Sequence, residues 1–151
     1  MKKIAHQAWA SGDPGLAFKN RINKDNITKE YLGELEASNP CAEIFEYPGE
    51  ACCLGSINLH KFYVESTNNV DWVALEEVTR LSVRFLDNVQ EVSVLPLEDI
   101  NETCKGLRRL GLGPAMGWAD LLAELGLAYD SEQAYKLGEY ISWFISFFAW
   151  Q

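Results

Sequence analysis

The segment that decides the fold reads Asn-Pro-Cys-Ala-Glu-Ile at residues 39–44 and continues as Ala-Cys-Cys-Leu-Gly-Ser-Ile-Asn-Leu at residues 51–59. An amide, a thiol and a carboxylate alternate at Asn39, Cys41 and Glu43. Because alternate residues of an extended segment point to the same side, we expect these three groups to face one site. They would offer it a hydrogen-bonding amide, a one-electron or nucleophilic sulfur and a base. The spacing alone also fits a capped turn with a solvent-facing Glu43.

Around this segment the pattern predicts short strands at residues 43–47 and 51–58, and mainly helices elsewhere. The clearest helix is expected over residues 71–92, with Asp71 as its N-cap. Six side chains at helical spacing define its buried stripe: Leu75, Val78, Ser82, Phe85, Leu86 and Val89. Other helices are predicted over 2–10, 16–22, 97–105 and 118–125, the last closed by Gly126, with a strand and turn over 107–116.

The last predicted helix, which begins after Ser131 as N-cap, is apolar on both sides. One stripe comprises Ala134, Leu137, Ile141, Phe144, Ile145 and Phe148, and the opposite side carries Tyr140, Trp143, Phe147 and Trp150. The apolar run over 140–150 is too short for a membrane span, which needs about 20 residues. The helix is therefore expected to need a partner surface. The chain begins close to the middle of a predicted helix and ends at Gln151 without a cap or Gly, so we expect a segment of a larger fold.

Composition is that of an ordinary globular protein, with 48% hydrophobic and 23% charged residues. The net charge of −9 argues against binding of a nucleic acid polymer, which requires clustered Lys and Arg. It does not exclude a nucleotide, whose phosphates can bind at a helix N-terminus. No signal peptide or membrane segment is predicted, and the expected compartment is the cytoplasm.

The cysteines do not have the spacing of a metal site. They are Cys41, Cys52, Cys53 and Cys104, separated by ten, none and fifty residues. Zinc sites favour short Cys-x-x-Cys pairs with further Cys or His ligands, so no metal site is predicted. Cys104, within a predicted helix, is expected to be a small buried hydrophobic residue.

The segments at 39–44 and 51–59 resemble the active-site region of the ribonucleotide reductase large chain. The resemblance extends to Trp-Ala-Ser-Gly-Asp-Pro-Gly-Leu at 9–16 and Val-Arg-Phe-Leu-Asp-Asn-Val at 83–89. Arg-Arg-Leu-Gly-Leu-Gly at 108–113 and Met-Gly-Trp-Ala-Asp-Leu-Leu at 116–122 continue it in the family's order. The motifs are most similar to those of the adenosylcobalamin-dependent class.

This resemblance implies an α/β fold, helix-rich with short strands, that is part of the family's ten-stranded α/β barrel. Residues 1–151 would form a single incomplete segment of the catalytic barrel domain. The implied function is ribonucleotide reduction to deoxyribonucleotide by thiyl-radical chemistry, with the isolated segment inactive. The implied partners are a ribonucleotide, the remaining segments of the catalytic chain, and a thioredoxin-like or glutaredoxin-like reductant. Adenosylcobalamin is the expected cofactor; otherwise a partner subunit would generate the radical.

The resemblance also implies roles for four residues. Cys41 matches the cysteine that becomes a thiyl radical and takes the ribose 3′ hydrogen. Glu43 matches the carboxylate that accepts the 3′-hydroxyl proton, and Asn39 matches the amide that hydrogen-bonds the ribose hydroxyls. Cys52 matches one of the two cysteines that reduce the sugar and end as a disulfide.

Two departures from the family pattern leave alternatives open. The family's partner for Cys52 lies far upstream, outside the matching region, and Cys53 stands where Asn is expected. The glycine segment at 111–117 is one residue longer than expected and is interpreted as a tight barrel turn. One alternative is a non-catalytic remnant that binds a partner through the apolar last helix. Another is a small thiol redox protein that uses Cys52 and Cys53, although it lacks a Cys-x-x-Cys helix start.

Overall fold

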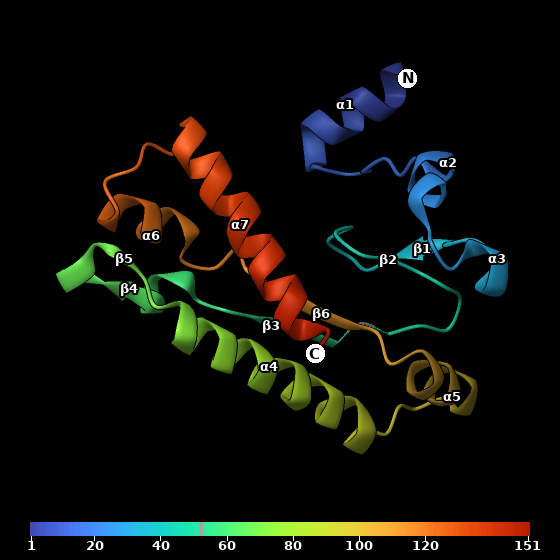
Figure 1. The fold of residues 1–151 in the computed structure, drawn as a ribbon. Helices are drawn as coiled ribbons and strands as arrows, with labels where there is room; N and C mark the ends of the chain where they lie inside the picture. Colours follow the sequence, from blue (N-terminus) through green and yellow to red (C-terminus); the bar gives the residue numbers. More distant parts are fainter. Residues whose placement is uncertain (52) are drawn as a thin grey trace. The chain divides into compact units, whose positions relative to one another are not determined.

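The computed structural model describes residues 1–51 and 53–151 of the chain. These residues form two compact units, Met1–Ala51 and a second unit whose described part runs from Cys53 to Gln151. Figure 1 labels the helices and strands of both units. The combination of helices with short strands, one pair of them parallel, confirms the predicted α/β class.

The first unit contains short helices and one small hairpin. Its elements are α1 (Lys2–Ser11), α2 (Lys19–Ile22), the 3-10 turn η1 (Asn23–Asp25), α3 (Lys29–Leu32), β1 (Ala37–Ser38) and β2 (Phe45–Glu46). The helix predicted over 2–10 is present as α1, which ends at Gly12 in the left-handed conformation with φ of 81°. The helix predicted over 16–22 is shorter, because α2 begins only at Lys19.

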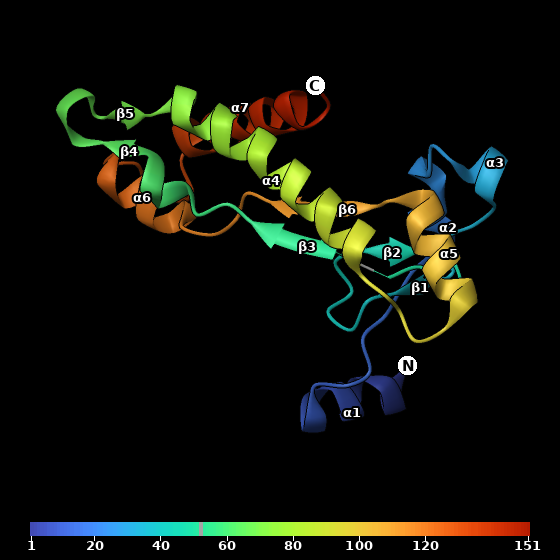
Figure 2. The same ribbon diagram turned by 90° about the horizontal axis from the view of Figure 1, so that it is seen from below.

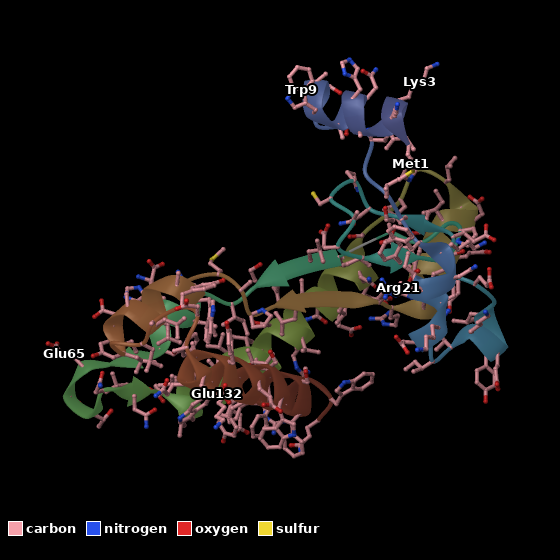
Figure 3. The ribbon with its side chains drawn as sticks, turned by 90° about the horizontal axis from the view of Figure 1, so that it is seen from above. Met1, Lys3, Trp9, Arg21, Glu65 and Glu132 are labelled. Carbon is pink, nitrogen blue, oxygen red and sulfur yellow. The ribbon has the colours of Figure 1, made fainter. Side chains whose placement is uncertain are left out.

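Helix α1 buries none of its residues within the structure. Trp9 is 82% exposed, and its ring lies beside the neighbouring His6 ring, with centroids 5.7 Å apart. Figure 3 shows Trp9 and Lys3 projecting from this helix. Its helical conformation therefore depends on local hydrogen bonds rather than on burial of an apolar face.

The second unit combines longer helices with two small sheets. Its elements are β3 (Cys53–Ser56), the 3-10 turn η2 (Leu59–Phe62), β4 (Tyr63–Val64), the 3-10 turn η3 (Glu65–Thr67), β5 (Asn69–Val70), α4 (Trp72–Val92), α5 (Glu98–Leu107), β6 (Leu110–Gly113), α6 (Trp118–Glu124) and α7 (Glu132–Ala149). Strands β4 and β5 form an antiparallel hairpin that the sequence pattern did not predict.

Strands β3 and β6 pair in parallel, with Cys53 opposite Leu110 and Ser56 opposite Gly113. Parallel strands need a long crossover, and α4 and α5 supply it. Figure 2 shows α4 running along this pair of strands. Among the described residues β3 and β6 form a two-stranded sheet, so the strands do not close into a barrel.

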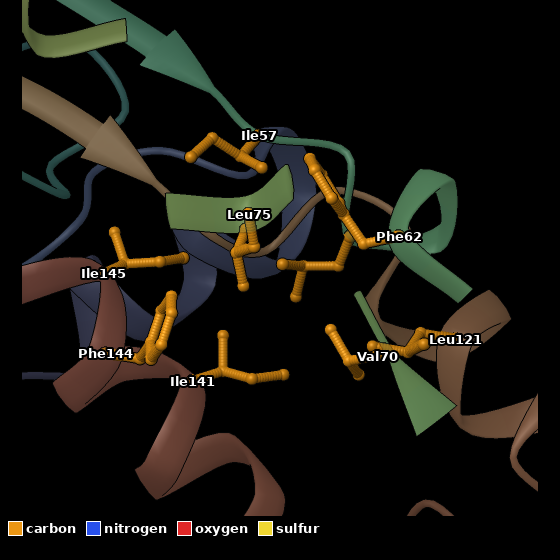
Figure 4. Packing of buried hydrophobic residues seen from close by; sticks show 9 residues of the cluster. Ile57, Phe62, Val70, Leu75, Leu121, Ile141, Phe144 and Ile145 are labelled. Carbon is orange, nitrogen blue, oxygen red and sulfur yellow. The ribbon is translucent and has the colours of Figure 1, made fainter. Parts of the chain in front are cut away.

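The core of the second unit lies between α4, α6, α7 and the segments that follow β3. Figure 4 shows its buried apolar side chains. They are Ile57, Leu59, Phe62, Val70, Leu75, Leu121, Ile141, Phe144 and Ile145. This cluster connects α7 to the loops at the carboxyl ends of the strands, and so fixes the helical layer relative to the sheet.

Helix α4 confirms the prediction over 71–92. Asp71 caps it, because its Oδ1 accepts from the backbone N–H of Ala74 at 3.0 Å. The predicted stripe is correct at Leu75 and Leu86, but wrong at Phe85, which is 63% exposed. Thr79 is buried instead: its hydroxyl donates to the carbonyl oxygen of Leu75 at 2.7 Å, which removes the cost of burying a polar group.

Helices α6 and α7 also confirm their predictions. Gly126 follows α6 with φ of 71°, and the Ser131 hydroxyl accepts from the Ala134 N–H at 3.2 Å at the start of α7. The predicted stripe of α7 faces the core, whereas Trp143 is 55% and Phe147 is 44% exposed. No helix among residues 1–51 and 53–151 is both long and apolar enough to cross a membrane.

Candidate functional site

Residues 39–44 connect β1 to β2 as a tight turn. The two strands are antiparallel, with Ser38 opposite Phe45. The backbone N–H of Asn39 donates to the carbonyl oxygen of Ile44 at 3.2 Å, and the N–H of Ile44 donates to Oδ1 of Asn39 at 3.3 Å. The N–H of Ala42 donates to the carbonyl oxygen of Asn39 at 3.0 Å. Asn39 therefore organises the turn with both its backbone and its side chain.

The prediction that Asn39, Cys41 and Glu43 alternate along an extended segment is wrong. Ala42 has φ of 62°, so the chain reverses direction between the thiol and the carboxylate. The structure instead has the capped turn that the spacing also allowed. Asn39 is half-buried, while Cys41 and Glu43 are exposed. The physical reason is Pro40, whose fixed φ suits the second position of a β-turn, and the hydrogen bond from the Ala42 N–H to the Asn39 carbonyl oxygen closes that turn.

A buried asparagine supports this hairpin from the preceding helical segment. Asn23 is 3% exposed, and its Nδ2 donates to the carbonyl oxygens of Lys19 and Leu35 at 3.1 and 3.0 Å. Its Oδ1 accepts from the N–H of Leu35 at 2.8 Å. These bonds attach the residues before β1 to α2 and η1.

A second polar cluster holds the other end of the hairpin. Tyr47, directly after β2, is 5% exposed. Its hydroxyl lies 2.7 Å from Oγ1 of Thr28 and within 3.1 Å of the Asn26 amide. The N–H of Tyr47 donates to Oε2 of Glu50 at 2.8 Å. Both strands that flank the turn are thus attached to the η1–α3 region by buried hydrogen bonds.

The entry to β1 also carries surface ion pairs. Glu34 binds Nζ of Lys29 at 2.9 Å and Nζ of Lys19 at 3.2 Å, and Lys19 also lies 3.5 Å from Glu36. The hydrogen bond from Lys29, followed by that from Lys19, holds the pKa of the Glu34 carboxyl below its usual value. The hydrogen bond to Glu34 raises the pKa of the Lys19 ammonium.

The second cysteine segment begins β3. Cys52 lies outside the described residues, and Cys53 follows it as the first residue of the strand. Cys53 is half-buried, with its Sγ 3.8 Å from the carbonyl oxygen of Leu86 on α4. The side chain of Leu86 fills the space above Gly55, because a Cβ at Gly55 would lie 3.3 Å from its methyl carbons. Gly55 therefore permits close packing of α4 on β3.

An arginine links α4 to the start of β6. Arg108 follows α5 with φ of 48°, and its Nε donates to Oδ1 of Asp87 at 2.9 Å while another guanidinium nitrogen binds Oε2 of Glu91 at 2.6 Å. The hydrogen bond to Glu91 raises the pKa of Arg108 and lowers that of Glu91. Beside it, Nε2 of Gln90 donates to the carbonyl oxygen of Arg109 at 2.5 Å.

Cys104 and His60 both lie in the second unit. Cys104 is 8% exposed on α5, which confirms its prediction as a buried small residue. His60 lies 3.4 Å from Oε1 of the exposed Glu124. Within residues 1–51 and 53–151, no group of three or more Cys, His, Asp or Glu side chains is arranged to hold a metal ion.

Sequence reasoning missed the residues that build the supports of both cysteine segments. Asn23 and Asn26 lie in a polar stretch without a periodic signal, and Tyr47 was expected only as the last residue of the strand predicted over 43–47. Arg108 was identified only as part of a motif. Its left-handed backbone and its two acidic partners depend on tertiary contacts with α4, which single-sequence patterns do not reveal.

Comparison with known proteins places the chain in a family. The family described as ribonucleotide reductase, barrel domain, matches residues 1–151. A vitamin B12-dependent ribonucleoside-diphosphate reductase of Mycobacterium tuberculosis is 47% identical over 134 residues, which cover 89% of this chain and 19% of that protein. A protein of the same name from Thermoplasma acidophilum is 41% identical over 143 residues, covering 95% of this chain and 18% of that protein.

The similarity extends to relatives of another type. A ribonucleoside-diphosphate reductase subunit alpha from Chlamydia trachomatis is 32% identical over 154 aligned positions, covering 99% of this chain and 14% of that protein. The chain thus spans less than a fifth of the length of these curated relatives. Since the family match covers the whole sequence, the chain belongs to the ribonucleotide reductase barrel-domain family.

Proposed function

We propose that residues 1–151 form one segment of the catalytic barrel domain of a ribonucleotide reductase. The segment would contribute Asn39, Cys41, Glu43 and Cys52 to the reduction of a ribonucleotide. The observation that supports this most directly is the exposed Cys41 thiol, held on a fixed turn within a chain that matches the reductase barrel over its whole length. The substrate would be a ribonucleoside diphosphate or triphosphate, and the names of the relatives favour the diphosphate.

In this proposal Cys41 begins and ends the reaction as a thiyl radical. The radical takes the 3′ hydrogen, so that an S–H bond forms as the C3′–H bond breaks. Glu43 accepts the proton of the 3′-hydroxyl, and the 2′-hydroxyl leaves as water after a thiol of the reducing pair protonates it. The thiols of Cys52 and a second cysteine of the catalytic chain supply two electrons and two protons in all and become a disulfide, with the second proton going to C2′ and Glu43 returning its proton to the 3′ oxygen. Cys41 then returns the hydrogen to C3′, which restores the thiyl radical.

The geometry of the turn is suited to these roles. Oδ1 of Asn39 already accepts from the Ile44 N–H, so the amide nitrogen is the part of this side chain that would donate to a ribose oxygen. Cys41 and Glu43 are both exposed, on either side of the reversal at Ala42. A thiol and a carboxylate held on one short, hydrogen-bonded turn would keep a fixed spacing relative to a bound sugar.

The radical generator in this proposal is adenosylcobalamin, because the M. tuberculosis and T. acidophilum relatives are named as vitamin B12-dependent. When bound, the cofactor supplies the one-electron oxidation of the Cys41 thiol. The exposed position of Cys41 fits this requirement. We assign no residue of this chain to binding of the cofactor itself. A thioredoxin-like or glutaredoxin-like protein would reduce the disulfide afterwards.

The proposal is tested by combining this chain with polypeptides that supply the rest of a reductase catalytic chain. Deoxyribonucleotide formation is expected only in the combined sample, and Cys41→Ser should abolish it. Cys104→Ala is the matched control, because Cys104 is buried on α5 and has no role in the proposed chemistry. Turnover that persists in Cys41→Ser would contradict the radical assignment. Turnover by the isolated chain would contradict the need for further segments.

A second candidate function, partner binding without catalysis, is favoured by the outer face of α7. Tyr140, Trp143 and Phe147 are exposed there and stack in series, with ring centroids 5.6 and 5.5 Å apart. Exposed aromatic rows of this kind are typical of interaction surfaces. Sedimentation tests this candidate with the chain alone at high concentration and with the chain mixed with other reductase segments. A chain that stays monomeric in both samples would argue against it.

A further inference from the structure

One turn of α4 contacts the amino end of β3. The carbonyl oxygen of Leu86 accepts from the Cys53 thiol at 3.8 Å, and the Leu86 side chain packs directly on Gly55. A leucine packed on a glycine leaves little freedom for the strand to shift without losing contact. The position of Cys53 is therefore coupled to the position of this helical turn.

The same turn holds the amino end of β6. Asp87 and Glu91 are four residues apart, so both side chains reach the same side of the helix, where Arg108 binds them. Gln90, which is 8% exposed, donates to the carbonyl oxygen of Arg109. A guanidinium that binds two carboxylates is a directional link that a lysine cannot reproduce.

Both sets of contacts act on strand ends that pair with each other in the sheet. Leu110, the residue directly after Arg109, pairs with Cys53. A two-stranded sheet is only marginally stable without packing against other elements. The contacts from α4 thus supply the restraint that the strand pairing alone does not provide.

We propose that Asp87, Gln90 and Glu91 are positioning residues for the cysteine segment at the start of β3, acting through Arg108 and Arg109. This inference rests on the proposed function, in which Cys52, the residue before Cys53, delivers electrons to the sugar. The role of the α4 contacts is to hold β3, which begins at Cys53, in one fixed register with β6, so that the chain leading into the strand starts from a constant position.

Thiol accessibility provides a direct test on the chain itself. In a Cys52→Ser background, cleavage after Glu50 and Glu65 leaves Cys53 as the remaining thiol of residues 51–65 and puts Cys41 in another peptide, so the rate of alkylation of Cys53 by iodoacetamide can be followed by mass spectrometry. Asp87→Asn and Arg108→Lys are each expected to increase this rate several-fold, because local opening exposes the half-buried Cys53. Asp87→Glu, which keeps the charge, should restore part of the protection.

Control variants and control thiols distinguish a local effect on Cys53 from a general destabilisation of the second unit. Arg80→Lys is the matched variant, because Arg80 also pairs with a carboxylate of α4, Glu76 at 3.0 Å, but its further contacts are with Gln151 and the Phe148 ring of α7, and it should leave the Cys53 rate unchanged. The exposed Cys41 should react at the same rate in every variant. An unchanged Cys53 rate in Asp87→Asn and Arg108→Lys would overturn the proposal. An equal acceleration at the buried Cys104 would also overturn it, because the second unit would then be opening as a whole.

Turnover of a complete catalytic chain tests the functional consequence separately. Asp87→Asn is expected to lower kcat and leave the KM for the ribonucleotide unchanged, because electron delivery rather than substrate binding is affected. A change in KM alone would contradict the positioning role. If the complete chain with Asp87 intact shows no turnover, the proposed function fails, whereas the alkylation result still decides whether α4 restrains Cys53.

Discussion

The backbone N–H of Ile44 donates to Oδ1 of Asn39 at 3.3 Å, and this hydrogen bond closes the turn that carries Cys41. The amide of Asn39 thus has a structural bond through its oxygen, while the proposed contact with the ribose would use its nitrogen. The two tasks belong to different atoms of one side chain, so different substitutions should separate them.

Asn39→Asp is expected to keep the turn and to abolish turnover of a complete catalytic chain. A carboxylate still accepts from the Ile44 N–H but has no N–H to donate to the ribose. Asn39→Ala removes both the bond from the Ile44 N–H and the proposed bond to the ribose. Hydrogen exchange at the Ile44 amide should therefore stay slow in Asn39→Asp and become fast in Asn39→Ala. If both variants turned over like the unmodified chain, Asn39 would have no part in binding the sugar.

Cys41→Ser should leave stability unchanged to within about 0.5 kcal/mol, as expected for an exposed side chain. Cys104→Ser should destabilise the second unit by about 1–3 kcal/mol, because it places a hydroxyl in a buried position. Thermal unfolding followed by circular dichroism measures both. A large loss of stability in Cys41→Ser would show that the thiol has a structural role, and its loss of activity would then not identify the radical site.

Gly117→Ala is expected to destabilise the start of α6. Gly117 has φ of 69°, and an added Cβ would overlap Oδ1 of Asn58 and lie 2.9 Å from the backbone nitrogen of His60. Left-handed strain alone costs about 1–3 kcal/mol, and the overlap adds to it. Gly106→Ala is the matched control, since nothing lies within 4 Å and the residue is helical. It should stabilise by about 0.5–1 kcal/mol. Equal unfolding temperatures for the two variants would contradict this account.

The ion pairs at the entry to β1 predict a pH dependence of the first unit. The pKa of Glu34 is lowered in the folded chain, so its contribution to stability is present above the usual value of 4.5 and is lost as the pH falls through the folded pKa. Glu34→Gln should flatten this acid-side decline, and added salt should weaken it in the unmodified chain. Glu30→Gln, also on the surface of the first unit, should leave the decline in place. An NMR titration in which Glu34 kept its usual pKa would contradict the prediction.

The long helices were predictable because their signals are local. Asp71 and Ser131 are caps whose bonds reach only three residues ahead, and the apolar stripes repeat within a few turns. The sequence did not predict that Thr79, rather than Phe85, lies on the buried face of α4. Hydrophobicity ranks Phe above Thr, but the Thr79 hydroxyl finds its partner within the helix, and the orientation of α4 is set by what packs on it.

The geometry of the candidate site was not predictable from the sequence. The motif at 39–44 singled out Asn39, Cys41 and Glu43, and their roles at a catalytic site stay a prediction. The turn itself depends on Ala42, an unremarkable residue with φ of 62°. The supports contributed by Asn23, Tyr47 and Arg108 come from distant segments, so no local pattern predicts them.

The parallel pairing of Cys53 with Leu110 also has a consequence for synthesis of the chain. The two residues are 57 positions apart (110 − 53), so a ribosome delivers the strand with Cys53 well before its pairing partner. Until residues 110–113 emerge, the thiol segment has neither β6 beside it nor the β6 contacts of α4. Nascent chains should therefore be most vulnerable to oxidation at these cysteines during that interval, and completion of β6 should end it.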